Sequence, residues 1–182
     1  MKRIVWKFGL IAGVIVAGMM AITVPLCMTQ ALDFSISAAI GYSSMVLAFL
    51  AVFFGIRSYR DKVGGGAITF LRALGVGLLI ALIGCAVYVV SWEIVFWGFM
   101  PDFADKYAAV SLEHLKAKGA SAETLAAETA KMEEFKRLYQ NPFFNVGMTF
   151  MEVFPVALIV TLVSAAILRR KPGLPAAATA MA

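Results

Sequence analysis

Four long apolar stretches dominate this sequence, at residues 4–28, 36–56, 70–100 and 143–168. A helix needs about 20 consecutive apolar residues to cross the hydrocarbon core of a bilayer, and each stretch is long enough. The third is longer than required, so we expect its helix to tilt or to project into the interface. The pattern predicts an all-α polytopic membrane protein with four transmembrane helices.

The composition supports this class. Hydrophobic residues make up 62% of the 182-residue chain and charged residues 15%. A soluble domain is typically about half apolar and about a quarter charged. A chain of this length cannot enclose the excess in a core of its own, so much of it has to face lipid. We expect a single membrane domain over residues 1–182, with a disordered tail at 172–182.

The basic residues are distributed unevenly around the four stretches. They cluster before the first, between the second and third, and after the fourth, whereas the connection between the first and second has none. Because Lys and Arg are retained on the cytoplasmic side, both termini are expected in the cytoplasm. The first stretch is longer than the ~7–15-residue core of a signal peptide, so we interpret it as a span. The clustered residues are Lys2, Arg3, Lys7, Arg57, Arg60, Lys62, Arg72, Arg169, Arg170 and Lys171.

The segment 102–140, between the third and fourth spans, has a different character. It is charged, rich in Ala, Glu and Lys, and free of proline. Gly119 suits the end of one helix and Ser121 the N-cap of another, which predicts an extracytoplasmic helical hairpin. Each helix carries an apolar stripe, and we expect the stripes to pack on each other and on the end of the bundle. Asn141 and Pro142 then suit the cap and first position of the last span.

Polar side chains gather in the outer halves of the predicted spans. Glu152 lies about ten residues inside the fourth stretch, about 10–15 Å from its outer end at ~1.5 Å per residue. A charge at the bilayer centre costs about 3 kcal/mol, and acids within spans usually face the bundle interior and mark a site. We therefore expect a polar pocket in the outer half of the bundle, with the hairpin over it. Its predicted lining is Glu93, Glu152, Asn145, Thr149 and Ser44, with Thr23 as a further candidate.

Two simpler interpretations of these side chains stay open. Glu93 lies near the outer interface between Trp92 and Trp97, so it can extend to the headgroups within a belt of aromatic side chains. The stripe of Asn145, Thr149 and Glu152 can instead serve interhelical hydrogen bonding.

The connection between the second and third spans is the second candidate site. Arg57, Arg60 and Lys62 lie at headgroup level and are predicted to bind anionic lipid. The glycines at 64–66 allow a tight turn, whose backbone N–H groups are a candidate cradle for an anion. The alternative is a basic loop that only sets the orientation of the chain.

The remaining chemistry-bearing residues are few. Cys27 and Cys85 lie in separate apolar stretches and are expected to be buried, and His114 is the sole histidine. Its alternatives are a packed or surface side chain, or a ligand or pH-sensing group. We expect no metal site, no cofactor and no nucleic-acid partner.

Several motifs resemble a known bacterial family of small four-helix membrane proteins, domain-of-unknown-function family four-one-nine-nine. They are "GIRSYRDKVGGGAITFLRA", "YVVSWEI", "PDFADKY" and "YQNPFFNVGMTFMEVFPVALIVTLVSAAILRR". In the resemblance Glu93 falls in a Trp-Glu motif and Glu152 in a Glu-x-x-Pro motif that ends at Pro155. Ala157 departs from it, because glycine is expected there. The resemblance implies an inner-membrane location and no established activity.

Three classes of function compete. The leading one is a non-enzymatic membrane protein whose outer pocket binds a lipid, a small ligand or a partner protein. The second is a small ion- or proton-coupled transporter that uses Glu93 and Glu152, although the inner halves of the spans carry no matching polar stretch. The third, an intramembrane enzyme, is the least favoured, since two lone carboxylates supply neither nucleophile nor metal ligands. Membrane lipids are the expected partners, and a homo-oligomer stays open.

Overall fold

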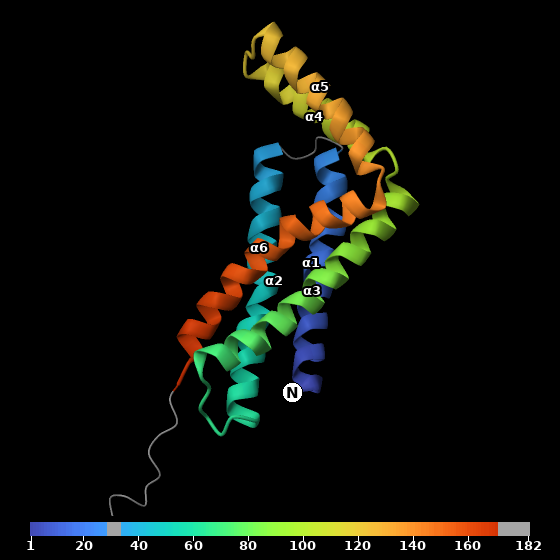
Figure 1. Cartoon of the computed structure of the whole chain (residues 1–182). Helices are drawn as coiled ribbons and strands as arrows, with labels where there is room; N and C mark the ends of the chain where they lie inside the picture. Colours follow the sequence, from blue (N-terminus) through green and yellow to red (C-terminus); the bar gives the residue numbers. More distant parts are fainter. Residues whose placement is uncertain (29–33, 171–182) are drawn as a thin grey trace, which may run out of the picture.

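The computed structural model describes residues 1–28 and 34–170, and the described chain is helical (Figure 1). The tail predicted at 172–182 lies outside these residues. Four of the helices are long and apolar enough to cross a membrane, which confirms the all-α multi-pass prediction. The elements are α1 (Lys2–Met28), α2 (Phe34–Lys62), α3 (Phe70–Phe99), α4 (Phe103–Ala117), α5 (Ala122–Tyr139) and α6 (Pro142–Leu168).

The four long helices form one bundle. α1 packs against α2 and α3, and α6 packs against α3 and α2. α3 and α6 run at a pronounced inclination to α1 and α2 (Figure 1). The N-terminus, the α2–α3 connection and the end of α6 lie at one end of the bundle, and α4 and α5 extend from the other. All three basic clusters therefore share one end.

Two glycines let α1 and α3 approach closely. A Cβ atom placed on Gly9 would lie 2.7 Å from Cβ of Ile83, and one on Gly13 would lie 2.5 Å from Cβ of Val87. Both distances are too short for real side chains. Gly9 and Gly13 thus form a close-packing motif between α1 and α3 of the same chain.

α4 and α5 lie between α3 and α6 in the sequence and pack against each other. Gly119 follows α4 with a φ of +74°, a left-handed conformation that glycine adopts readily. Ser121 caps α5, its side chain accepting a hydrogen bond from the N–H of Thr124 at 3.2 Å. Lys136 of α5 meets Asp105 of α4 at 3.1 Å, and hydrogen bonds to Glu133 and Asp105 raise the pKa of Lys136.

The last span begins as its sequence predicts. The Asn141 side chain accepts a hydrogen bond from the N–H of Phe143 at 3.0 Å, and Pro142 occupies the first turn of α6. At the other end of the bundle, α2 continues past residue 56 to Lys62. Its last turn carries Arg60 and Lys62, whose charges suit a helix C-terminus, and the glycines begin after Val63.

Candidate functional site

A buried polar cluster joins α3 to α6 in the half of the bundle nearest α4 and α5. The Trp92 indole Nε1 donates a hydrogen bond to Oδ1 of Asn145 at 3.0 Å. Thr149 donates to the same oxygen at 3.4 Å, and the Asn145 amide nitrogen donates to the Tyr139 carbonyl at 3.4 Å. Asn145 is fully buried, and Trp92, Thr149 and Tyr139 are nearly so. One amide thus fixes α3, α6 and the end of α5 together.

Aromatic rings cover this cluster from the side of the hairpin. Trp92 meets Phe103 of α4 edge to face, with ring centroids 4.7 Å apart. Tyr139 packs against Phe96 at 5.3 Å and against Phe135 at 4.9 Å. Such pairs contribute about 0.5–1.5 kcal/mol each beyond the area that they bury. The foot of the hairpin therefore closes the cluster, while its tip projects beyond the ends of α1 and α2 (Figure 1).

Burial affects the chemistry of Tyr139, which lies outside the membrane spans. It raises the pKa of the Tyr139 phenol to about 12, while neighbouring Thr149 and Trp92 act in the opposite direction. The phenol is neutral at any ordinary pH. It can therefore donate a hydrogen bond to a carboxylate or to a ligand.

Glu93 lies beside this cluster and is half-buried. Its Oε2 accepts a hydrogen bond from the Trp97 indole at 2.9 Å. Its Oε1 is buried and, among the described residues, has no hydrogen-bond partner. A buried carboxyl oxygen without a partner is costly, so something else is expected to satisfy it.

Glu152 lies on the face of α6 that carries Asn145 and Thr149, and the residue is exposed. The carboxyl is close enough to interact electrostatically with the phenols of Tyr88 and Tyr139. Tyr139 also interacts in this way with Glu93. Within the described chain, no hydrogen bond or ion pair joins Glu152 to another side chain, and nothing links the two carboxyls directly.

The other predicted lining residues use their hydroxyls locally. Ser44 is buried and donates to the carbonyl of Gly41 in its own helix at 2.7 Å. Thr23 donates in the same manner to the carbonyl of Met19 at 2.9 Å. The structure thus gathers Asn145 and Thr149 and bonds Glu93 to Trp97 of its own helix. Glu152 lies on the face of α6 that carries the first two, and the hydroxyls of Ser44 and Thr23 are bonded within α2 and α1.

Three aromatic residues of the site were not predicted as part of it. The sequence predicts Trp92 as part of an aromatic belt at the interface and Tyr139 as part of the apolar stripe of its helix. It predicts no role for Tyr88. The sequence could have indicated Tyr139, because this residue comes two positions before Asn141, the N-cap of α6. A phenol at that position has to lie at the membrane end of the hairpin.

An apolar pocket of about 430 Å³ lies near this site, between the ends of α1 and α3. Val24, Pro25, Val95 and Phe99 contribute to its walls, and Lys106 of α4 lies at its edge. It contains none of the predicted site residues. Lys106 is itself bonded to Asp102 at 2.8 Å, and this contact holds the pKa of the Asp102 carboxyl below its usual value.

The opposite end of the bundle carries the predicted headgroup residues. Arg57 and Lys62 are exposed and Arg60 is partly covered. The expected anion cradle in the glycine turn is not free, because the N–H groups of Gly64, Gly66 and Ala67 already bond to carbonyls of the chain. The glycines serve the turn itself: Gly65 and Gly66 have φ values of 60° and 86°.

No group of three or more His, Cys, Asp or Glu side chains gathers anywhere in the described part of the chain. Cys85 is buried with a free thiol, as predicted, and the side chain of Cys27 lies outside the described residues. His114 is half-buried in α4.

The fold and this site define a polytopic α-helical membrane protein with a polar cluster between two of its spans. More specifically, the chain belongs to the DUF4199 family, described as "Protein of unknown function (DUF4199)", which matches residues 7–170. The resemblance drawn from the sequence motifs is thereby confirmed. No curated protein and no solved structure matches the chain.

Proposed function

We propose that this protein is a non-enzymatic component of the bacterial inner membrane, with cytoplasmic termini, that binds a membrane ligand in the outer half of its bundle. The ligand classes are a lipid, a small molecule or a partner protein, and the chemistry favours a group that donates hydrogen bonds to a carboxyl. The orientation rests on the basic clusters, which all lie at the end opposite to α4 and α5.

The observation that carries the proposal is the position of Glu152. It is exposed on the surface of a membrane span, with the neutral Tyr139 phenol and the buried Asn145 and Thr149 close behind it. An acid at such a depth normally faces a partner, because hydrocarbon solvates it poorly. Here the partner has to come from outside the chain, because no hydrogen bond or ion pair joins Glu152 to another side chain of the described residues.

The same groups argue for binding rather than catalysis. Asn145 and Thr149 already bond to neighbouring groups of the cluster, and Trp92 is committed to Asn145. These bonds fix the shape of the cluster. The carboxyls of Glu93 and Glu152 are then the groups left to recognise a ligand.

The test is what stays bound to the purified protein. Native mass spectrometry of protein extracted in a mild detergent measures both bound lipid and the number of chains. We expect a retained lipid in the parent and about tenfold less in Glu152→Gln, the loss of one hydrogen bond to a charged group. Glu123→Gln, in the first turn of α5, makes the same charge change away from the site and is expected to retain the lipid.

Other outcomes of that experiment are equally informative. A dimer that is lost in Glu152→Gln would identify the ligand as a second copy of the chain. Equal retention in the parent and in Glu152→Gln, with no dimer, would contradict a ligand site at this carboxyl and leave the cluster a structural one.

A proton- or ion-coupled transporter is the second candidate, favoured by the two carboxyls that both interact with Tyr139. Against it, the buried hydroxyl of Thr161 in the other half of α6 donates to the carbonyl of Ala157 at 2.7 Å and is not free to line a path. Proteoliposomes with a pH-sensitive dye decide between the two. Flux in the parent that disappears in Glu93→Gln and Glu152→Gln would establish transport, and we expect none.

A further inference from the structure

The α2–α3 connection and the end of α6 are tied together by the backbone. Ile68 and Arg170 form an antiparallel bridge, in which the N–H of Ile68 donates to the Arg170 carbonyl at 3.0 Å and the reverse bond measures 2.8 Å. The bridge therefore fixes the backbone of Arg170 near the end of α2, although the two are far apart in the sequence.

The turn that permits this bridge requires glycine. A Cβ atom on Gly64 would lie 2.3 Å from the carbonyl oxygen of Ala67, and Gly65 and Gly66 are left-handed. Ile68 is buried, which anchors the connection against the bundle. The position of Arg170 is thus built into the fold.

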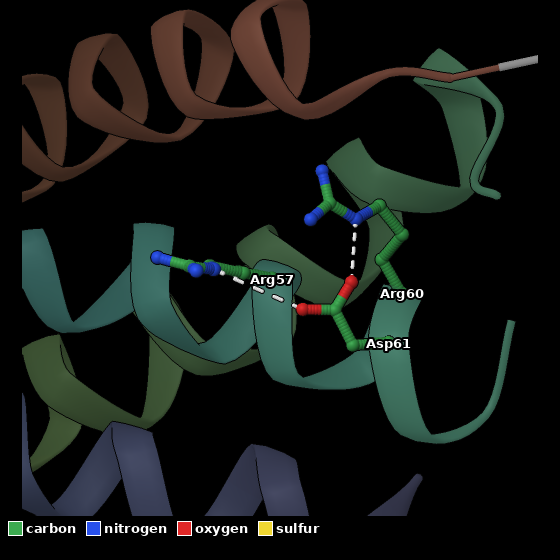
Figure 2. A network of polar contacts seen from close by, with 3 residues as sticks. All are labelled: Arg57, Arg60 and Asp61. Atoms are coloured by element: carbon green, nitrogen blue, oxygen red, sulfur yellow. Dashed lines mark hydrogen bonds and ion pairs between the residues drawn. The ribbon is translucent and has the colours of Figure 1, made fainter. Parts of the chain in front are cut away.

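Asp61 organises the arginines at this place. Its Oδ1 lies 2.8 Å from Nε of Arg60, and its Oδ2 lies 3.8 Å from Nε of Arg57. Figure 2 shows the carboxylate between the two guanidinium groups, whose terminal nitrogens extend away from it. Arg170 interacts electrostatically with the same carboxylate. Two guanidinium groups thus contact one acid and a third lies within electrostatic range of it, so the cluster keeps an excess of positive charge.

We infer that Arg57, Arg60 and Arg170 form a binding site for a phosphate group at this end of the bundle. A guanidinium presents a planar fork of N–H donors that matches phosphate oxygens, and Asp61 engages only the Nε side of two of them. The cluster lies where α2 and α6 both end, and because both are candidate membrane spans, it is expected at the level of the lipid phosphates. The site is separate from the polar cluster of the proposed function and does not depend on it.

The structure changes the earlier expectation for this region in two respects. The anion is held by side chains and not by the glycine turn, whose N–H groups are largely occupied. Arg170, from the end of α6, becomes a member of the site because the bridge brings it there.

The experiment compares a lipid phosphate with a free one. The full-length protein is stripped of lipid and placed in nanodiscs of phosphatidylcholine with added phosphatidylglycerol, and native mass spectrometry counts the retained anionic lipid. The measurement is made at about 0.5 M salt, where general surface attraction is screened within a few ångströms. In a parallel arm, inorganic phosphate is titrated into the detergent-solubilised protein and the melting temperature is recorded.

We expect one retained phosphatidylglycerol in the parent and about tenfold weaker retention in Arg60→Gln and in Arg170→Gln. Arg60→Lys keeps the charge but not the fork, and is expected to lose most of the binding too. Arg72→Gln, an exposed residue in the first turn of α3, makes the same charge change and is expected to bind like the parent.

A saturable rise in melting temperature with inorganic phosphate, lost in Arg170→Gln, would assign the site to a free phosphate instead of a lipid. Binding in neither arm, or an equal loss in Arg72→Gln, would overturn the site. Because Arg170→Gln leaves the backbone bridge able to form, an unchanged melting temperature without ligand shows that the variant is folded.

Discussion

A buried hydrogen bond between the side chains of Trp92 and Asn145 joins α3 to α6. Between membrane helices, apolar packing gives little preference for one register, because lipid is as apolar as the interface itself. A directional bond fixes what packing alone leaves free. The neighbouring Thr149 and Tyr139 then take positions relative to the same amide.

Trp92→Phe is expected to destabilise the protein by about 1–2 kcal/mol, because the Asn145 oxygen loses its main donor while it stays buried. Unfolding by SDS in mixed micelles measures the free energy. Trp6→Phe, at an exposed tryptophan, is the matched control and should change it by less than about 0.5 kcal/mol. The double variant Trp92→Phe/Asn145→Leu should be destabilised by less than the sum of the two single changes, and simple additivity would contradict a bond between the two side chains.

Tyr139 gives the hairpin foot a dependence on alkaline pH. Burial raises the pKa of its phenol from 10.0 to about 12, so the folded state favours the neutral form. The resulting stability is complete below pH 10 and is lost as the pH rises from about 10 toward about 12. Absorbance at 295 nm, compared between the parent and Tyr139→Phe, isolates this phenol. A difference that develops with a midpoint near pH 10 would show that the foot is open to water.

The close approach of α1 and α3 is the feature of whole helices that is most easily tested. Gly13→Ala is expected to destabilise the bundle by about 1–3 kcal/mol, since the new methyl would lie 2.5 Å from Cβ of Val87, an atom that cannot move without its helix. Gly18→Ala in the same helix has nothing within 4 Å and should be neutral or stabilising by up to about 1 kcal/mol. Equal effects of the two changes on the unfolding free energy would show that α1 does not pack there.

The helices themselves were predictable because their signals are local. Apolar length marked the four spans, and Ser121, Gly119 and Asn141 marked the ends of helices through their own backbone geometry. The contact of Trp92 with Asn145 had no such signal, as the two lie 53 residues apart. The direction of Glu152 was equally hidden, because a span that is apolar all round does not reveal which of its faces meets lipid and which meets protein.

For the molecule as a whole, the two candidate sites lie at opposite ends of one bundle. The polar cluster of Trp92, Asn145 and Thr149 lies near the hairpin, and the arginine cluster lies where α2 and α6 end. The apolar middle that separates them is closely packed, with Gly77 of α3 against Thr161 of α6. Binding at one site is therefore expected to be independent of binding at the other.

The orientation of the bundle decides which leaflet each site meets, and it can be measured directly. In a background of Cys27→Ala and Cys85→Ala, the variants Ala126→Cys in α5 and Val63→Cys after α2 both place an exposed thiol at an end of the molecule. The basic clusters predict that a membrane-impermeant maleimide labels Ala126→Cys in cells with a permeabilised outer membrane, and Val63→Cys only after the inner membrane is opened. The reverse pattern would place the arginine cluster outside the cytoplasm, away from the anionic inner leaflet that its charge suits. Labelling of both thiols in intact inner membranes would contradict the assignment of α3 as a complete span.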